Sequence, residues 1–310
     1  MKLKTKNIQS LKEYLSKLNI AKERSHKGQN GRVMVIGGSK LFHSASIWAA
    51  EIASHFADIV HYSSTEENNE IMQNLKTKFR NGIVVHKKDL PEYVKEDDAV
   101  LVGPGMIRNQ VQTSKFKVQN LNNKFEEILK IEDEAEYSRE LTHFLLLQFP
   151  KKKFVVDAGA LQMFDQEILT KRSKNTILTP HQLEFFRTFG IDLSKLSVDE
   201  KATIVQKTAK KYNCTILLKA VTDIVSDGDE IIFIEGGNQG LTKGGTGDIL
   251  AGLTLSFFAK NDPLISAATA SIVEKYAAEQ LAKTKGNWYN TSELLDCIPT
   301  VFAQLIYNKD

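Results

Sequence analysis

The chain has 310 residues, of which 42% are hydrophobic and 25% are charged, the composition of an ordinary folded globular protein. Its 41 Lys and Arg residues nearly balance 38 Asp and Glu residues, so the net charge is only +3. The positive surplus is not gathered into an arm, which excludes a dedicated nucleic-acid-binding protein.

The sequence also argues against a membrane protein. No run approaches the roughly 20 apolar residues that a membrane-spanning helix needs, and the N-terminal residues lack the apolar stretch of a signal peptide. Cys214 and Cys297 lie far apart and have no metal-ligand spacing. We therefore expect a cytoplasmic protein with reduced thiols and no membrane partner.

Apolar, β-branched runs alternate with helical patterns along the chain. Strands are predicted at 31–38, 58–64, 82–88, 99–105, 153–159, 176–180, 215–220, 223–228 and 230–236. Helices are predicted at 45–56, 181–189, 198–212, 247–259 and 264–282. Several strand runs are apolar throughout, as in parallel strands buried on both faces. The pattern predicts one α/β domain over residues 1–310, a doubly wound and mostly parallel sheet with helices on both faces.

Two segments depart from this alternation. Asp227 and Gly228 separate the last two predicted strands and are typical of a hairpin turn, so we expect an antiparallel edge there. Residues 106–149 contain neither Gly nor Pro and predict two amphipathic helices joined near 132–136, a helical insertion in the α/β pattern. The insertion is either a structural or oligomer-contact helix pair, or a lid over a site.

The chemically unusual residues follow the predicted strands. They lie in the segments GGSKLFHSAS (37–46), GPGM (103–106), DAGAL (157–161), TPHQLE (179–184), LKAVTD (218–223) and GGNQGLTKGGTGD (236–248). Because the carboxyl ends of parallel strands meet at one rim, where open α/β sheets bind ligands, we expect these segments to form one site.

The last of these segments holds six glycines in the twelve residues before Asp248 and leads into a predicted helix. It matches neither the Lys-Ser/Thr ending of a Walker A loop nor the dinucleotide fingerprint. Bare backbone N–H groups at a helix start form an anion site, and glycines allow a phosphate to approach closely. We expect Thr246 to add a hydroxyl donor.

Asp248 would be unfavourable in a passive phosphate site, because it places a carboxylate beside an anion. As a general base it would accept a hydroxyl proton while the N–H groups stabilise the transferring phosphoryl group. The alternative is that Asp248 only caps the helix. The glycines and the shared rim favour the base.

The motif GGTGDILAGL (244–253) resembles the G-[AT]-G-D signature of the ribokinase-like superfamily. With HKGQNGRVMVIGGS (26–39), LVGPG (101–105), VVDAGAL (155–161), LTPHQLEF (178–185) and LLKAVTDIV (217–225), the chain resembles the ADP- or ATP-dependent NAD(P)H-hydrate dehydratases. The similarity runs in order from about residue 25 to 282, interrupted by the predicted insertion at 106–149.

The resemblance implies a ribokinase-like fold and a metabolite-repair reaction. Such enzymes use ADP or ATP, with Mg²⁺, to phosphorylate the C6 hydroxyl of hydrated NADH or NADPH. Phosphate then leaves and the ring double bond returns, so that the net reaction is that of a carbon–oxygen lyase. The residues leave ADP and ATP both open as donors. Relatives commonly form tetramers, which implies a homo-oligomer.

The resemblance also implies roles for individual residues. Asp248 matches the residue that contacts the substrate hydroxyl, and His181 and Glu184 match a substrate-contacting loop. Ala45 and Gly105 match the hydrated-nicotinamide pocket. The nucleotide-binding residues are implied to be Lys219, Ala220, Val221, Thr222, Asp223, Gly244, Gly245, Thr246 and Gly247. Asp157 either binds Mg²⁺ through water or caps a turn.

Departures from the family pattern lie on the substrate side. Ser44 and Ile107 stand where the family shows glycines, and Gly159 stands where it shows a second aspartate. Residues 54–64 also lack an expected glycine-rich turn. Two alternatives stay open for this reason: a kinase for a small alcohol or vitamin precursor, and a nucleotide-binding regulatory module without turnover. The intact Asp248 argues against the second.

Overall fold

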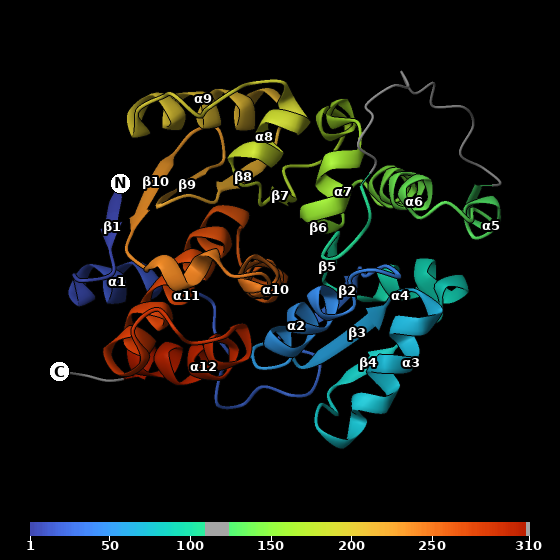
Figure 1. Cartoon of the computed structure of the whole chain (residues 1–310), viewed down its shortest axis with the longest axis horizontal. Coiled ribbons are helices and arrows are strands. Elements are labelled where there is room, and N and C mark those ends of the chain that lie inside the picture. Colours follow the sequence, from blue (N-terminus) through green and yellow to red (C-terminus); the bar gives the residue numbers. More distant parts are fainter. Residues whose placement is uncertain (109–123, 308–310) are drawn as a thin grey trace.

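The computed structural model describes residues 1–108 and 124–307, and within them ten strands form one sheet (Figure 1). The strand order is β1-β10-β9-β8-β7-β6-β5-β2-β3-β4. The strands are β1 (Lys2–Lys4), β2 (Arg32–Ile36), β3 (Ile59–Ser63), β4 (Gly82–Val84), β5 (Ala99–Val102), β6 (Lys153–Val156), β7 (Thr176–Leu178), β8 (Thr215–Leu218), β9 (Thr222–Ser226) and β10 (Ile231–Glu235). Every predicted strand is confirmed, and β1 is additional.

Strands β2 to β8 are all parallel to one another, whereas β9 is antiparallel to both β8 and β10. The predicted hairpin between β9 and β10 is confirmed, and Gly228 at its turn has a φ of 95°. Strand β1 pairs in parallel with β10 and forms the outer edge. Three residues carry too short a pattern for this strand to be predicted.

Helices cover both faces of the sheet (Figure 1). One face carries α1 (Ile8–Leu15), α2 (Ser44–Ala53), α3 (Glu66–Asn74), α10 (Thr246–Lys260), α11 (Pro263–Lys285) and α12 (Thr291–Tyr307). The other carries α4 (Leu90–Glu96), α5 (Lys124–Ile128), α6 (Glu134–Gln148), α7 (Ala158–Met163), α8 (Gln182–Phe189) and α9 (Val198–Lys211). The predicted doubly wound architecture is confirmed.

Alternate residues of each inner strand enter the two cores. In β2, Val33 and Val35 pack with the α10 side, while Met34 and Ile36 pack with the α6 side. Burial on both faces is why these strands are apolar throughout. Because the chain runs from β2 outward to β4 and then from β5 in the opposite direction, the topological switch point lies between β2 and β5. Ligands bind beside such a point in open α/β sheets.

The predicted helical insertion is only partly within the described residues, since 109–123 lie outside them. The second predicted helix corresponds to α6, whose Leu141, Leu145 and Leu146 are fully buried. The ring of His143 accepts a hydrogen bond of 2.9 Å from the backbone N–H of Asp165. Helix α6 is therefore part of the core and lies on the connection between the parallel strands β5 and β6.

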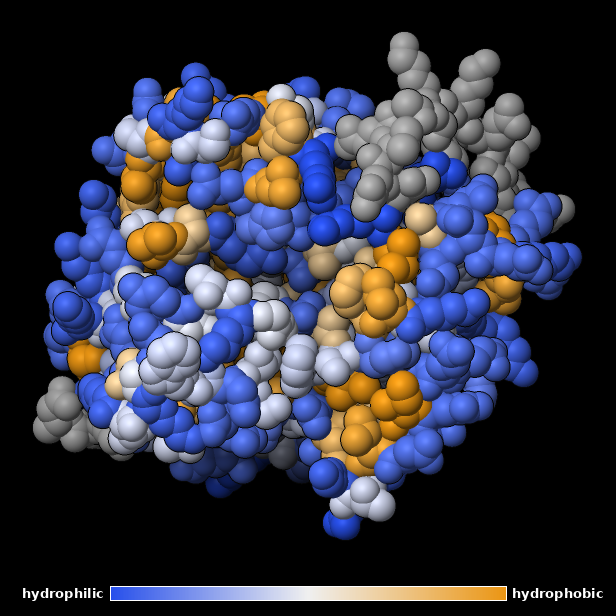
Figure 2. Space-filling model, viewed as in Figure 1, coloured by the Kyte–Doolittle hydropathy of each residue, from blue (hydrophilic) through white to orange (hydrophobic). Residues whose placement is uncertain are grey.

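Within the described part of the chain, no helix combines the length and the apolar character required to cross a membrane. On the face seen in Figure 2, hydrophobic residues form separate patches among polar ones.

Candidate active site

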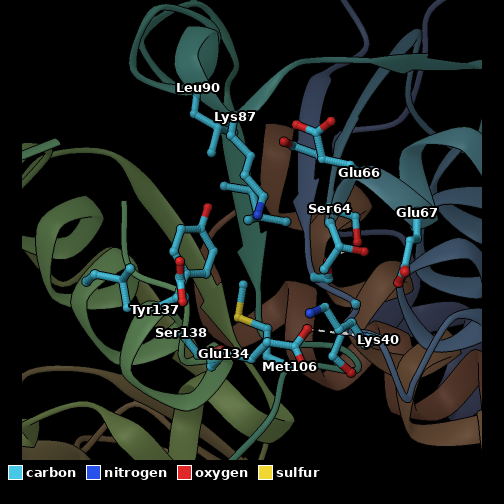
Figure 3. A pocket seen from close by; sticks show the side chains of 18 residues that line it. Lys40, Ser64, Glu66, Glu67, Lys87, Leu90, Met106, Glu134, Tyr137 and Ser138 are labelled. Carbon is cyan, nitrogen blue, oxygen red and sulfur yellow. Dashed lines mark hydrogen bonds between the residues drawn. The ribbon is translucent and has the colours of Figure 1, made fainter. Parts of the chain in front are cut away.

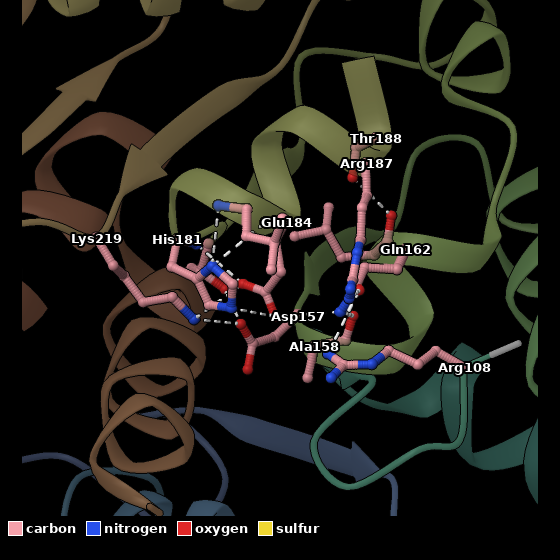
Figure 4. A network of polar contacts seen from close by, with 12 residues as sticks. Arg108, Asp157, Ala158, Gln162, His181, Glu184, Arg187, Thr188 and Lys219 are labelled. Carbon is pink, nitrogen blue, oxygen red and sulfur yellow. Dashed lines mark hydrogen bonds and ion pairs between the residues drawn. The ribbon is translucent and has the colours of Figure 1, made fainter. Parts of the chain in front are cut away.

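The loops that follow β6, β7 and β8 lie side by side at one rim of the sheet (Figure 4). A parallel bridge between His181 and Lys219 extends the pairing of β7 and β8 beyond both strands. The backbone N–H of Lys219 donates a 2.8 Å hydrogen bond to the carbonyl of Pro180. The loops after β7 and β8 are therefore held side by side, because the pairing of the two strands continues into them.

The Lys219 ammonium lies between two buried carboxylates. Its Nζ is 2.9 Å from Oδ1 of Asp157 and 3.7 Å from Oε2 of Glu184. The hydroxyl of Thr179 also donates to Oδ1 of Asp157, at 2.7 Å. Burial lowers the pKa of Lys219, but the charges of Asp157 and Glu184 outweigh it and hold this pKa above its usual value. Lys219 is a fixed cation.

His181 and Glu184 form the start of α8. Nδ1 of His181 accepts hydrogen bonds from the N–H groups of Leu183 (3.2 Å) and Glu184 (3.3 Å), and Oε2 of Glu184 accepts one from the His181 N–H (2.9 Å). This is a capping box with histidine as N-cap. Because Nδ1 accepts, the ring proton is assigned to Nε2. Burial lowers the pKa of His181, which favours the neutral ring.

The glycine loop, residues 236–247, leads into α10. Gly245 is the N-cap with a φ of 98°, and a Cβ there would lie 2.3 Å from the Trp48 ring. A Cβ on Gly244 would meet no heavy atom within 4 Å. The expected donor on Thr246 is already used, because its buried hydroxyl bonds to the carbonyls of Leu241 (2.8 Å) and Lys243 (2.9 Å). Its hydroxyl therefore shapes the loop.

The first turn of α10 has free backbone donors. The N–H groups of Gly247 and Asp248 have no acceptor among residues 1–108 and 124–307. A Cβ on Gly247 would be 3.5 Å from Nζ of Lys219, so the ammonium lies against this turn. Two N–H groups, the helix dipole and a fixed cation together form a site for a phosphate-like anion.

Asp248 lies in this same turn and is half-buried. The N-cap of α10 is Gly245, so the capping interpretation of Asp248 is wrong. Burial, followed by the charge of Asp157, raises the pKa of Asp248 to about 7, although Lys219 opposes the shift. A carboxylate with this pKa is suited to accept a proton near neutral pH.

Residues 219–223, called the nucleotide turn after the role that the resemblance implies, have one side chain in solvent and another in the core. Val221 is 92% exposed, whereas Asp223 is 4% exposed. The Asp223 carboxylate accepts hydrogen bonds from the Ala220 N–H (2.8 Å) and the Ser271 hydroxyl (2.7 Å). Asp223 therefore holds the turn together from inside, and Thr222 is the first residue of β9.

Ala45 and Gly105 meet at the switch point. A Cβ on Gly105 would lie 3.0 Å from that of Ala45 and 3.3 Å from Cα of Gly38. The N–H of Gly38 donates to the carbonyl of Pro104 at 2.7 Å. The loops after β2 and β5 are thus in backbone contact, and the two predicted pocket residues are neighbours.

The unusual Gly159 has a steric reason. A Cβ at this position would be 2.1 Å from the carbonyl oxygen of Met106. The loop after β5 therefore leaves no room for a side chain at this position. Ala158, directly before it, has a φ of 46°, a strained value for a residue with a side chain. Ser44 is exposed on the first turn of α2.

Sequence reasoning missed a group of polar residues behind Glu184 (Figure 4). Nε2 of Gln162 donates to Oε1 of Glu184 at 3.3 Å, and Oε1 of Gln162 accepts from Arg187 (2.7 Å) and Arg108 (3.4 Å). The only feature of the sequence that could have indicated Gln162 is its position one helical turn after Ala158, which places it near the strand ends. Glu184 is thus surrounded by protein donors, which makes it a residue that positions His181 and Lys219.

A cavity lies next to the switch point, at the carboxyl ends of β2 and β3 (Figure 3). The start of α6 covers one side, where Oε1 of Glu134 accepts a hydrogen bond from the Lys40 N–H at 2.9 Å. Nζ of Lys87 lies 4.4 Å from the centre of the Tyr137 ring. The segment predicted as an insertion therefore contributes to a cavity wall as well as to the core.

No cluster of three or more His, Cys, Asp or Glu side chains suited to a metal ion exists among the described residues. Oδ1 of Asp157 is held by Thr179 and Lys219. Although Asp157 is the N-cap residue of α7, its side chain makes no capping hydrogen bond, so the turn-cap interpretation is wrong.

Comparisons with known sequences agree with these features. Residues 33–300 match the family described as NAD(P)H-hydrate dehydratase. The chain is 32% identical to the bifunctional NAD(P)H-hydrate repair enzyme of Methanocaldococcus jannaschii, over 89% of this chain and 49% of that protein. It is 29% identical to the ADP-dependent (S)-NAD(P)H-hydrate dehydratase of Nitrosopumilus maritimus, over 90% of this chain and 91% of that protein. The chain spans about half the length of the bifunctional relatives it matches.

Solved structures share the fold. A ribokinase-like superfamily protein from Enterococcus faecalis has a TM-score of 0.78 at 22% identity, covering 96% of this chain and 95% of that one. The ADP/ATP-dependent NAD(P)H-hydrate dehydratase from Bacillus subtilis, co-crystallised with ATP and Mg²⁺, has a TM-score of 0.72 at 20% identity, covering 96% and 97%. The ribokinase-like fold expected from the sequence is confirmed.

Proposed function

Because the chain belongs to the NAD(P)H-hydrate dehydratase family, we propose that it uses a nucleotide to convert hydrated NADH or NADPH back to NADH or NADPH. The observation that carries this proposal is the placement of Asp248 in the first turn of α10, against Lys219 and two free N–H groups. This geometry supports transfer of a phosphoryl group to a hydroxyl. The net reaction is that of a carbon–oxygen lyase.

The first step phosphorylates the substrate. The Asp248 carboxylate accepts the proton of the C6 hydroxyl, and the hydroxyl oxygen forms a bond to the terminal phosphorus of the nucleotide. The bond between that phosphorus and its bridging oxygen breaks, and the shortened nucleotide leaves with the electron pair. A base with a pKa of about 7 is ionised to a useful extent at neutral pH.

The second step eliminates phosphate. The C6–O bond breaks with its electron pair on the departing phosphate, and loss of a proton from C5 restores the ring double bond. Phosphate is a much better leaving group than hydroxide, which is the reason for consuming a nucleotide. The N–H groups of Gly247 and Asp248, together with Lys219, stabilise the negative charge that moves through the site in both steps.

Mg²⁺ fits this arrangement as a companion of the nucleotide. It keeps several waters and needs only one or two protein carboxylates beside phosphate oxygens, so no protein cage is required. Asp157 is the carboxylate proposed to hold its water ligands. When bound, the ion would neutralise phosphate charge. ADP and ATP are both proposed as donors.

On the substrate side, we propose that the hydrated nicotinamide lies beside Ala45 and Gly105, which are in contact at the switch point. His181 is proposed to contact the substrate as well; its Nε2 lies 3.6 Å from Oε1 of Glu184. The protein is proposed to be cytoplasmic and homo-oligomeric, with a tetramer as the expected form.

The test is an absorbance assay. Hydrated NADH is incubated with the protein, Mg²⁺ and either ADP or ATP, and the reduced-nicotinamide absorbance is followed. Its return with one nucleotide identifies the reaction and the donor together. No return with either, despite nucleotide binding by calorimetry, would overturn the dehydratase proposal. Small alcohols would then be tested as substrates of a kinase.

A further inference from the structure

One face of α11 lies behind the nucleotide turn and carries side chains that reach two separate loops. Ser271 and Lys275, four residues apart, contact the nucleotide turn. The carbonyl of Ala278 and the carboxylate of Glu279, one turn later, accept hydrogen bonds from the glycine loop. This spacing places all four residues on one side of the helix.

The Lys275 ammonium is enclosed by oxygen atoms. Nζ donates to the carbonyls of Val221 (3.0 Å), Ala220 (3.2 Å) and Gly236 (3.5 Å). It also lies 3.4 Å from Oδ1 of Asp223. Lys275 and Asp223 are each 4% exposed, so the cation is beyond the reach of a ligand and acts on the chain itself.

We propose that Lys275, with Asp223 as its counter-ion, is a positioning residue for nucleotide binding, because it fixes the nucleotide turn against the start of the glycine loop. The inference rests on the proposed function, in which both segments contact the nucleotide. No catalytic step is assigned to Lys275.

The charge balance of this buried group supports the assignment. Burial, followed by the charge of Asp223, raises the pKa of Glu274 to about 8, which favours its neutral form at pH 7. Burial raises the pKa of Asp223 as well, but Lys275 and the hydrogen bonds from Ala220 and Ser271 favour its ionised form. Asp223, with Oδ1 3.4 Å from Nζ, is assigned as the carboxylate that compensates Lys275. Removal of either member would leave the other as an uncompensated buried charge, which is strongly unfavourable.

The three carbonyl contacts connect the two loops. Ala220 and Val221 directly follow Lys219, while Gly236 is the first residue of the glycine loop. Further along that loop, Nδ2 of Asn238 donates to the carbonyl of Ala278 at 2.8 Å. Loss of the Lys275 ammonium would therefore release the turn that carries Lys219 while α11 still holds the glycine loop.

The experiment compares two lysine variants by calorimetry with ADP and with ATP. Lys275→Met is expected to weaken nucleotide binding roughly 10- to 100-fold, the size of effect seen at metal sites when a residue that supports the ligand-contacting groups is removed. The Michaelis constant for hydrated NADH should stay unchanged. This split separates a positioning role from a general loss of structure.

Lys153→Met is the matched control. Nζ of Lys153 also donates to three carbonyls, those of Phe258 (2.8 Å), Asn261 (3.1 Å) and Ala259 (3.4 Å), but at the C-terminal end of α10. Lys153 is the first residue of β6, at the opposite end of the strand from Asp157. The control should lose thermal stability and keep nucleotide affinity.

Unchanged nucleotide affinity in folded Lys275→Met would overturn the inference, and so would an equal loss in the control. If Lys275→Met does not fold, Asp223→Asn serves in its place, since the amide keeps the shape of the side chain but removes the counter-ion. Normal nucleotide affinity in Asp223→Asn would also overturn it. Nucleotide binding by the wild type without dehydration would refute the proposed function alone, whereas no binding would refute both.

Discussion

The two halves of the candidate site are held together in different ways. On the side proposed to bind the nucleotide, Lys219, Asp157 and Glu184 form a network of charges, and Lys275 with Asp223 forms another behind it. On the side proposed to bind the hydrated nicotinamide, the loops after β2 and β5 meet through backbone contacts that require the absence of a side chain. The structure of the first half depends on specific charged side chains. The structure of the second half depends on residues small enough to let the backbones approach each other.

This difference agrees with the departures from the family pattern that the resemblance implied, which lie on the proposed substrate side. Replacing a member of a buried charge network leaves a partner uncompensated, so the identity of each member is constrained. A backbone contact constrains only the size of a residue. At Gly159, for example, the Met106 carbonyl fills the space that a side chain would need.

The largest effect should come from the proposed base. Asp248→Asn should lower turnover by ~10²–10⁴-fold, because the amide cannot accept the hydroxyl proton. Nucleotide binding, measured by calorimetry, should persist, because the N–H groups and Lys219 remain. An Asn variant with near wild-type turnover would remove Asp248 from the mechanism.

Lys219→Met tests the charge network directly. We expect kcat to fall by roughly 10²–10³-fold, the loss typical when a group that stabilises transition-state charge is removed. Nucleotide affinity should fall as well, unlike in Asp248→Asn. Steady-state kinetics and calorimetry on both variants measure the contrast, and equal nucleotide affinity in the two would contradict it.

Adding one methyl group to a glycine tests the half of the site proposed to bind the hydrated nicotinamide. Gly159→Ala should destabilise the protein by about 1–3 kcal/mol and raise the Michaelis constant for hydrated NADH, because its Cβ would overlap the Met106 carbonyl. Nucleotide affinity should remain normal.

Gly244→Ala is the matched variant, since a Cβ there meets no heavy atom within 4 Å. It should keep its melting temperature but bind nucleotide more weakly. If Gly159→Ala and Gly244→Ala both changed nucleotide affinity, or both changed the Michaelis constant for hydrated NADH, the division of the site into two halves would be wrong.

The smallest effect is on pH dependence. Because the pKa of Asp248 is raised to about 7, kcat/KM should fall as the pH drops below this value, by about tenfold per pH unit. The free energy of unfolding should change in the opposite direction and increase as the pH drops. The folded-state pKa lies above the ordinary carboxyl value, so the stabilisation from Asp248 is complete only at low pH and is lost as the pH rises to about 7.

Thermal melts at about pH 5 and pH 8 measure this second response. The melting temperature of Asp248→Asn relative to the wild type should be higher at the higher pH. A flat pH–rate profile between these values would show that a different group limits the reaction.

Much of the fold could be predicted because long apolar strands and amphipathic helices carry their pattern locally. Strand β1 and the short helices α1, α3 and α4 were not predicted, because segments of this length show too little hydrophobic periodicity to be recognised. The C-terminal helix α12 was also missed, although it is long; it contains Pro299, a residue that argues against a helix.

By itself, the sequence determined the alternation of β2 to β10 with most of the longer helices, the glycine loop and the position of Asp248 at a helix start. These features depend on residues close together in the chain. Only the tertiary structure decided that Asp223 turns inward, that Gln162 supports Glu184, and that Lys275 connects two loops. These contacts join residues 22 to 55 positions apart, apart from the local turn at Asp223. Their partners are selected by burial and charge compensation, which exist only after the chain has folded.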